Sequence, residues 1–400
     1  LIDNKRINAR LLSVEEFISK HFILEETRDI LKNISDIERL ISRINYGNAN
    51  PRDLVLLQGS LGLIPNLKQI LFEVESNLIV KLKNLDELGH ITLLIDRAIV
   101  DEPSVNISDG NFIKIGFNEE LDKYKRLAKD AKVLIKELEE KEKSRTGIRS
   151  LKIRYNRIFG YYIEITKPNV HLVPDNYVKK QTMVNAERFI TDELKNLEEQ
   201  ILSAEEKIIK IEQELFIEII EKIKNETKNI QHIAENIAYI DVLCSFAKIS
   251  LLNNYKKPII NEGYSLILKG NRHPIVEKLS DFVPNDLNIN KENRVMIISG
   301  PNMAGKSVYM KQIALTCIMA QMGCFVPSEY SEMAIVDKIF SRTGASDDIS
   351  QGHSTFMVEM NETSQILNNA TEKSLIILDE IGRGTSTFDG VSIAWSVAEY

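Results

Sequence analysis

The chain has 400 residues, with 51 Lys and Arg against 58 Asp and Glu and a formal net charge of −7. Hydrophobic residues make up 43% and charged residues 27%, a globular composition that excludes disorder. We find no run near the roughly 18 uninterrupted apolar residues that indicate a membrane span. The 18 glycines and 10 prolines are fewer than average usage predicts, which favours long helices over an all-β sandwich.

The cysteines Cys244, Cys317 and Cys324 form no Cys-x-x-Cys pair, and the six histidines are scattered. This pattern indicates neither a disulfide framework nor a zinc site, and it fits a reducing compartment, with buried apolar roles for the cysteines. The first residue is Leu1 rather than Met, and the helical pattern of 391–400 stops without a capping residue. We therefore expect the chain to be a fragment.

Apolar residues recur at intervals of three and four over 13–100, as in Ile37, Leu40 and Ile41. This spacing predicts amphipathic helices packed on one another as a scaffold. A short segment with strand and turn character interrupts the pattern, and the charged segment 118–145 predicts a further helix.

The residue pattern then changes. Over 151–166 apolar and polar residues alternate, and aromatic and β-branched residues are frequent, which predicts paired strands. Residues 175–257 contain neither Gly nor Pro, so we expect long helices there, including a returning helix over 185–224. Together these elements predict a small β-rich module at the tip of an antiparallel helical arm.

The predicted tip is basic, since 143–190 contains ten Lys and Arg against three Asp and Glu, a charge of +7 that leaves −14 for the remainder. A basic tip on an acidic body is the pattern expected of a surface that binds nucleic-acid phosphates without reading sequence. A solvated basic face with no partner remains the alternative.

A buried strand is predicted over 294–299, directly before the octet GPNMAGKS and a helix from Val308. The octet fits the phosphate-binding pattern G-x-x-x-x-G-K-[ST], in which backbone N–H groups converge on the phosphates. Lys306 is expected to reach the β and γ phosphates, and Ser307 to bind Mg²⁺. The expected nucleotide-binding residues are Gly300, Pro301, Asn302, Met303, Ala304, Gly305, Lys306 and Ser307.

A second buried strand, 374–378, ends in two acids. Asp379 is expected to hold Mg²⁺ and Glu380 to act as the general base toward water, with Lys306 as the other catalytic residue. Two polar, Gly-rich stretches, 344–355 and 382–387, offer hydroxyl and N–H groups to a γ-phosphate, including one bound by a neighbouring subunit. Ordinary surface loops are the alternative.

Besides the octet GPNMAGKS, the chain contains the stretches STFMVEM and LDEIGRGTSTFDG. Together these three stretches resemble the ATPase domain of the MutS family of DNA mismatch repair proteins, and the likeness continues upstream over essentially the whole chain. The stretches that carry it are 50–54, 160–165, 185–188, 272–274, 300–307, 354–360 and 378–390.

The resemblance implies a multidomain α plus α/β fold. It comprises a helical core and lever (1–130), a small β-rich DNA clamp (131–190), returning lever helices (191–257) and an incomplete ABC-type P-loop ATPase domain (258–400). It also implies ATP and Mg²⁺ as cofactors, a homodimer around double-stranded DNA, a downstream repair factor such as MutL, and a cytoplasmic, nucleoid-associated location.

The same resemblance assigns further residues. Phe282 is expected to stack on adenine, Asn302 to meet the γ-phosphate, and Ser354 and Thr355 to act on the nucleotide of the other subunit. The expected DNA contacts are Lys179, Lys180, Arg154 and Arg157.

The family's mismatch-reading N-terminal domain, with its Phe-x-Glu wedge, has no counterpart in these 400 residues, so mismatch recognition is expected only of the full-length protein. Hydrolysis by the 400 residues alone is not expected either, because the ATPase pattern stops before its switch histidine. Two alternatives stay open. One is the MutS-like lineage that acts on ribosomes or recombination intermediates, and the other is an SMC-like structural ATPase whose tip is a hinge.

Overall fold

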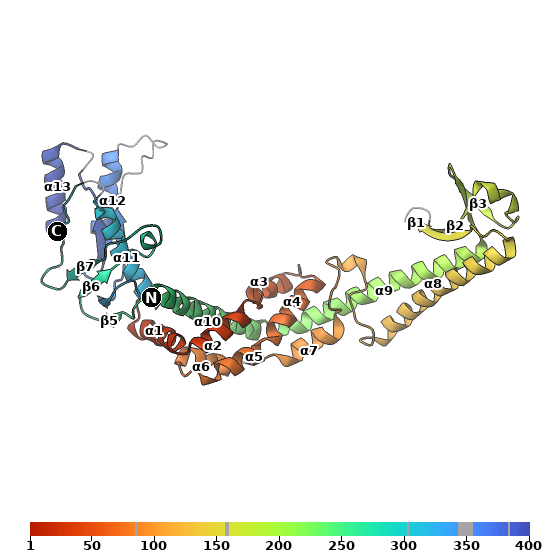
Figure 1. Ribbon diagram of the computed structural model, residues 1–400, viewed down its shortest axis with the longest axis horizontal. Helices are drawn as coiled ribbons and strands as arrows, with labels where there is room; N and C mark the ends of the chain where they lie inside the picture. Colours follow the sequence, from red (N-terminus) through yellow and green to blue (C-terminus); the bar gives the residue numbers. More distant parts are fainter. Residues whose placement is uncertain (85, 157–159, 302–303, 343–354, 383–384) are drawn as a thin grey trace. The chain divides into compact units, whose positions relative to one another are not determined.

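The computed structural model describes residues 1–84, 86–156, 160–301, 304–342, 355–382 and 385–400. The packing divides the chain into two compact units. Unit 1 comprises Leu1–Asn33, Pro65–Leu85 and Glu235–Tyr400, and unit 2 comprises Ile34–Ile64 and Asp86–Ala234. Figure 1 labels the elements along the chain. The fold combines many helices with small β-sheets, which confirms the mixed class predicted from the sequence.

Unit 2 is built on two long helices, α8 (Glu119–Thr146) and α9 (Asp192–Asn225), which lie side by side (Figure 1). They run antiparallel. The ion pairs Lys132–Glu205 and Lys141–Glu193 show this, because the residue with the higher number on α8 pairs with the residue with the lower number on α9. The helix predicted over 118–145 is confirmed. The shorter helices of the unit are α3 (Ile37–Asn45), α4 (Pro51–Gly62), α7 (Gly89–Ala98) and the 3-10 turn η2 (Ile107–Asp109).

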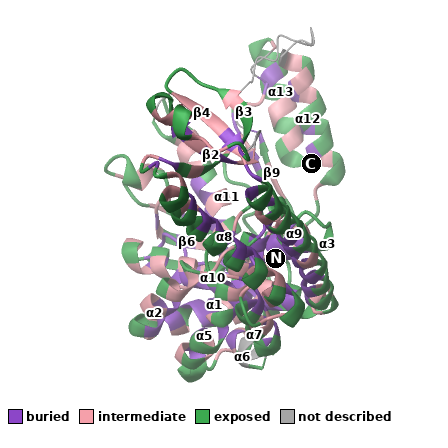
Figure 2. Ribbon diagram, turned by 90° about the vertical axis from the view of Figure 1, so that its right-hand side faces the viewer, coloured by how far each residue is buried: buried purple, intermediate pink, exposed green. Residues whose placement is uncertain are grey.

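The amphipathic pattern predicted for the short helices is confirmed in α3. In α3 the residues Ile37, Leu40, Ile41 and Ile44 are buried, while Glu38 and Arg39 face water. Figure 2 shows buried and exposed residues on opposite sides of such helices. Burial of the apolar side chains, each contributing roughly 1.5–3 kcal/mol, holds these short helices in place.

The sheet of unit 2 lies at one end of the α8/α9 pair (Figure 1) and has the strand order β1-β2-β4-β3, antiparallel throughout. The paired strands predicted over 151–166 are confirmed. The core of the sheet packs Ile163, Ile165 and Phe189 against apolar residues of both helices. The strands are β1 (Lys152–Asn156), β2 (Gly160–Thr166), β3 (Val178–Thr182) and β4 (Ala186–Ile190), with the 3-10 turn η3 (Lys167–Leu172).

The prediction of a returning helix from residue 185 is wrong at its start. Residues 186–190 form β4, and the helix begins at Asp192, where the Thr191 side chain accepts a hydrogen bond from the backbone N–H of Leu194. The absence of Gly and Pro permits a helix but does not require one. Pairing of β4 with both β2 and β3, which buries Phe189, outweighs the local preference.

A buried carboxylate on α9 holds the segment that precedes α8. Glu212 has no exposed surface, accepts hydrogen bonds from the backbone N–H groups of Phe112 and Ile113, and lies 2.8 Å from the Lys125 ammonium. Gly110 passes close to it, since a Cβ there would lie 3.2 Å from Ile209 and 3.5 Å from the carboxylate. A fully hydrogen-bonded buried charge of this kind fixes the path of the chain.

Unit 1 contains a four-stranded sheet of order β5-β8-β6-β7, in which β5 and β8 are parallel and the other pairs antiparallel. The helix α11 (Lys306–Met322) packs on this sheet through Ile313, Cys317 and Ala320. It begins two residues before the predicted start. The strands are β5 (Ile259–Asn261), β6 (Leu266–Asn271), β7 (Asn285–Ile289) and β8 (Tyr330–Ala334), with the 3-10 turn η4 (Val276–Lys278).

The helices in the earlier parts of unit 1 precede this sheet in the sequence. They are α1 (Asn4–Ser19), α2 (His21–Leu31), nearly all of α5 (Ile64–Ile70), the 3-10 turn η1 (Leu71–Glu73), α6 (Asn77–Lys83) and the greater part of α10 (Thr227–Asn253). All three cysteines of the chain are free and buried, as expected, and burial raises the pKa of the Cys324 thiol to about 11.

A separate parallel pair, β9 (Ile339–Arg342) and β10 (Leu375–Leu378), follows the sheet, together with α12 (Thr355–Asn369) and α13 (Thr387–Glu399). The strand predicted at 374–378 is confirmed, whereas the one predicted at 294–299 is not. Residues 293–300 are irregular, and Val295 and Ile297 are 64% and 86% exposed. An apolar run becomes a strand only where another strand takes up its backbone hydrogen bonds, and no described strand pairs with it.

By length and composition, one described segment, Pro51–Glu73, is apolar enough to cross a membrane. In the structure it is divided among α4, α5 and η1, with Pro65 near the start of α5. Its apolar side chains supply core, since the following are fully buried: Leu54, Leu57, Leu61, Ile64, Leu67 and Leu71. The segment is therefore accounted for by packing within the protein.

Candidate functional site

The described residues of the predicted phosphate loop before the helix, Gly300, Pro301, Ala304 and Gly305, lead into α11. Gly305 has a φ of +90°, in the left-handed region that favours glycine, and it stands at the N-terminus of the helix. The Lys306 Nζ donates hydrogen bonds to the carbonyl oxygens of Gly300 at 2.5 Å and Pro301 at 3.2 Å. The ammonium is thus held over the start of the loop, beside a helix N-terminus whose N–H groups and dipole favour anions.

The two predicted metal ligands meet. Asp379 directly follows β10 and Ser307 lies in the first turn of α11, and the Ser307 hydroxyl donates a hydrogen bond to Asp379 Oδ2 at 2.5 Å. Asp379 is only 7% exposed. Packing therefore brings together two oxygen ligands that are 72 positions apart in the sequence.

The donor set suits Mg²⁺ held jointly with phosphate. Among the residues that the structure describes, no group of three or more His, Cys, Asp or Glu side chains is placed to hold a metal by itself. Mg²⁺ in nucleotide sites is bound by one or two protein oxygens, with phosphate oxygens and waters completing its octahedron. One carboxylate and one hydroxyl match that requirement.

Glu380 follows Asp379 in an unusual backbone conformation. Its φ is +55°, in the left-handed region, which costs a residue other than glycine roughly 1–2 kcal/mol. The side chain is exposed, whereas the neighbouring Asp379 is buried. The turn therefore places two adjacent carboxylates in different surroundings, a buried one beside Ser307 and an exposed one.

The other predicted nucleotide contacts are only partly placed. Phe282 is half-buried in the segment between η4 and β7, and Ala304 is exposed in the loop. Asn302, Met303 and Ser354 lie outside the described residues. Thr355 is the first residue of α12, and its side chain is not described. Most of the stretch 344–355, and 383–384 in the second Gly-rich stretch, also lie outside the described part.

In unit 2 the strands of the sheet carry predicted DNA contacts. Arg154 on β1 is 53% exposed and lies 3.5 Å from Glu164, and Lys179 on β3 is 50% exposed and lies 2.7 Å from Glu187. Lys180, beside it on the same edge strand, is exposed. Exposed pairs of this kind are worth about 0–1 kcal/mol, so a phosphate can replace the carboxylate at small cost. Arg157 lies outside the described residues.

Arg188 on β4 has a different role from these exposed residues. Its guanidinium lies over the Tyr162 ring at 4.2 Å and donates a hydrogen bond to Gln181 on β3 at 2.8 Å. It also lies 3.9 Å from Glu164, and its Nε is buried. Arg188 therefore joins three strands across one face of the sheet.

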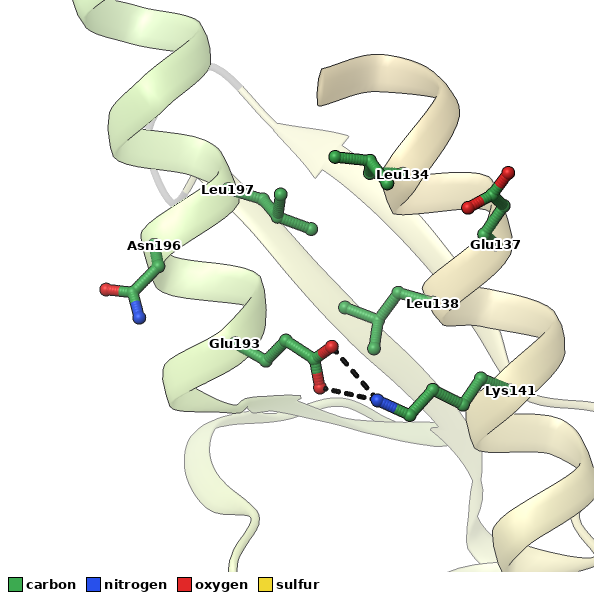
Figure 3. Close-up of a pocket in the computed structure, with 7 residues that line it drawn as sticks. All are labelled: Leu134, Glu137, Leu138, Lys141, Glu193, Asn196 and Leu197. Carbon is green, nitrogen blue, oxygen red and sulfur yellow. Dashed lines mark hydrogen bonds and ion pairs between the residues drawn. The ribbon is translucent and has the colours of Figure 1, made fainter. Parts of the chain in front are cut away.

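A shallow groove of about 400 Å³ lies between α8 and α9 close to the sheet (Figure 3). Leu134 and Leu138 of α8 point toward Leu197 of α9, and the ion pair Lys141–Glu193 crosses the groove. Both charged side chains are more than half exposed. The groove contains none of the predicted site residues, and we attribute it to the spacing of the two helices.

Two family models match the chain, MutS family domain IV over residues 116–207 and MutS domain V over residues 296–400. Across the whole chain it is 53% identical to a protein of Caldicellulosiruptor bescii and 49% identical to one of Clostridioides difficile, each named DNA mismatch repair protein MutS. The chain belongs to the MutS family. It covers 47% and 43% of those two proteins, so it spans about half the length of the curated relatives that it matches.

The MutS domain IV match takes in α8, the four-stranded sheet and the first half of α9, which includes all four predicted DNA contacts. The MutS domain V match takes in the loop 300–307, the Ser307–Asp379 contact and Glu380. Phe282 lies before that match. The roles of the individual residues stay predictions, because the family match does not assign them.

Within the MutS domain V match the structure adds residues that the sequence did not single out. Arg342 and Glu359 are 8% and 3% exposed, and both lie near the turn that carries Asp379 and Glu380. Glu359 lies in the STFMVEM stretch, and nothing in the sequence predicts that this glutamate is buried. Alternation of apolar residues finds core positions, whereas a buried carboxylate appears only once its partners are placed.

Proposed function

We propose that this chain provides the ATP site and the DNA-binding clamp of a DNA mismatch repair ATPase. The observation that carries the proposal is the contact between Ser307 and Asp379 beside the phosphate loop, in a chain identical at about half its positions to proteins named DNA mismatch repair protein MutS. A hydroxyl at a helix start and a carboxylate at a strand end are the pair that P-loop nucleotidases use.

In this proposal each residue of the ATP site has a defined task. Backbone N–H groups of 300–305 and the start of α11 bind the phosphates, and Lys306 exchanges its carbonyl contacts for phosphate oxygens. Ser307 and Asp379 hold Mg²⁺, which neutralises charge on the phosphates. Glu380 accepts a hydrogen bond from water and orients it. Phe282 provides the adenine contact.

The fold of this region is proposed to be an ABC-type P-loop domain that works in a homodimer. Asn302 then meets the γ-phosphate, and Ser354 and Thr355 contact the nucleotide bound by the other subunit. The position of Thr355 at a helix N-terminus supports this role, because such ends bind phosphate well.

The sheet of unit 2 is proposed to contact double-stranded DNA through the phosphate backbone. The segment 143–190 has ten basic and three acidic residues, and Lys179 and Lys180 are exposed on the edge strand β3. Such contacts give affinity without sequence preference. In the complete protein we propose mismatch recognition by parts outside this chain, a cytoplasmic location with nucleoid association, and repair signalled through ATP to a factor such as MutL.

Substitution of Lys306 tests the ATP site. Lys306→Ala removes the charge that faces the phosphates, so ATP affinity measured by calorimetry should fall about tenfold to a hundredfold, the loss expected of a hydrogen bond to a charged group. Lys311→Ala is the matched control, since Lys311 is exposed on the same helix and should leave the affinity unchanged. Equal ATP binding by the Lys306→Ala variant and the wild type would remove the phosphate-loop assignment.

A further inference from the structure

The backbone around the proposed catalytic turn is tied to β9. The last residue pair of the parallel ladder is Leu378 with Arg342, and the ladder continues with a hydrogen bond from the Asp379 N–H to the Arg342 carbonyl oxygen at 2.9 Å. Asp379 is therefore fixed by the sheet. Glu380 comes one residue later, in its left-handed conformation and beyond the ladder, and the turn that follows it has a further restraint.

That restraint comes from α12. The Glu359 side chain, 3% exposed, accepts a hydrogen bond from the Gly382 N–H at 2.6 Å. The Arg342 guanidinium lies 3.7 Å from the same Glu359 oxygen and donates a hydrogen bond to Glu362 at 3.1 Å. Glu359 is thus paired with a buried cation, and charge-assisted hydrogen bonds of this kind are strong.

The other side of Gly382 is closed by a second glycine. Gly382 has a φ of +81°, and a Cβ placed on it would lie 2.6 Å from both the Cα and the carbonyl oxygen of Gly390, on α13. The peptide two residues after Glu380 is thus held between a carboxylate on α12 and the backbone of α13.

We infer that Glu359 is a positioning residue that sets the orientation of Glu380 through the Gly382 N–H. The inference rests on the proposed ATPase function and goes beyond it, because the side-chain partners of Glu359 in the described part of the chain are the Gly382 N–H and Arg342, not the phosphate loop or the proposed metal ligands. Without its carboxylate the turn from Glu380 to Gly382 loses its anchor on α12. The base then spends less time directed at water, while the phosphates keep all of their contacts.

The test compares three variants in the complete gene product by single-turnover ATP hydrolysis and steady-state kinetics. Glu359→Ala should lower the hydrolysis rate at least about tenfold, the size expected when a buried, charge-assisted hydrogen bond is lost, with KM and ATP affinity within about twofold of wild type. Glu359→Gln keeps an oxygen for the Gly382 N–H and should lose less. Glu362→Gln is the matched control, since Glu362 also pairs with Arg342 but does not contact Gly382.

Amide hydrogen exchange at Gly382 provides a readout that does not depend on ATP. Exchange should be at least about tenfold faster in Glu359→Ala and unchanged in Glu362→Gln. Wild-type exchange at Gly382 in Glu359→Ala, or a wild-type hydrolysis rate, would overturn the inference. If the wild-type protein hydrolyses no ATP at all, the proposed function fails and the exchange measurement alone decides the role of Glu359.

Discussion

Gly160 holds the start of β2 against a carboxylate on α9. Its φ is +68°, and the neighbouring Tyr161 N–H donates a hydrogen bond to Glu198 Oε1 at 2.9 Å. A Cβ on Gly160 would lie 1.7 Å from the same oxygen. No side chain fits there unless Glu198 moves, so this glycine is required both for its conformation and for the close approach.

We expect Gly160→Ala to release this contact. The alanine adds the cost of a left-handed conformation, roughly 1–2 kcal/mol, and forces Glu198 away from the strand. Amide exchange at Tyr161 should therefore become at least about tenfold faster. Gly147→Ala is the control, since Gly147 has a φ of +71° but no heavy atom within 4 Å of an added Cβ. Equal exchange at Tyr161 in both variants would show that the contact with Glu198 does not matter.

At the residue scale, a motif proposes a role where it fixes the local backbone. Ser307 and Asp379 could be proposed as metal ligands from a loop that starts a helix and a strand that ends in an acid, and the structure adds that the two side chains are in contact. Glu359 and Gly382 could not be found in this way. The role inferred for them depends on a hydrogen bond between residues 23 positions apart. Glutamate and glycine are also common in surface loops, so the residue types alone do not mark them.

At the scale of elements, the edge strand β3 is the part of the sheet that DNA phosphates are proposed to reach. Each lysine that contacts a phosphate adds about one unit to the slope of log affinity against log salt concentration. The double variant Lys179→Ala, Lys180→Ala should lower that slope for duplex DNA by about two and weaken binding equally for all sequences. Fluorescence anisotropy over a salt series measures it.

The control for this experiment is Lys210→Ala, on an exposed part of α9 outside the sheet. It should leave the slope unchanged. An unchanged slope in the double variant would argue against β3 as the contact, and self-association of the protein through the sheet would favour a hinge of the SMC type. The same salt series therefore separates the clamp from the strongest structural alternative.

The long helix α8 and the strands β1, β2 and β10 were predictable because periodicity and runs of apolar residues are local properties. The two failures share a cause. Residues 186–190 form a strand because β2 and β3 lie on either side of them, and 293–300 form none because no described strand lies beside them. In both cases the presence or absence of a neighbouring strand decides whether the segment forms a strand, and the local sequence does not show whether such a neighbour exists.

At the scale of the molecule, the proposed ATP site belongs to unit 1 and the proposed DNA contacts belong to unit 2. The two activities can therefore be removed one at a time. Substitutions at Lys306 or Asp379 should leave the DNA contacts intact, and substitutions on β3 should leave the ATP site intact. How far each site could be predicted also differs, since an eight-residue motif specifies the proposed ATP site residue by residue, whereas composition gave the sheet only a net positive charge and the individual DNA contacts came from the family resemblance.

The most direct test of the ATP site is the Mg²⁺ dependence of ATP affinity, measured by calorimetry with Mg²⁺ and with EDTA. Asp379→Asn keeps the size of the side chain but removes the charge, and Asp337→Asn, an exposed acid just before β9, is the control. In the wild type and the control, Mg²⁺ should tighten ATP binding at least about tenfold, and Asp379→Asn should lose most of that gain. An equal effect of Mg²⁺ on the wild type and Asp379→Asn would contradict the assignment of Ser307 and Asp379 as the metal side of an ATP site.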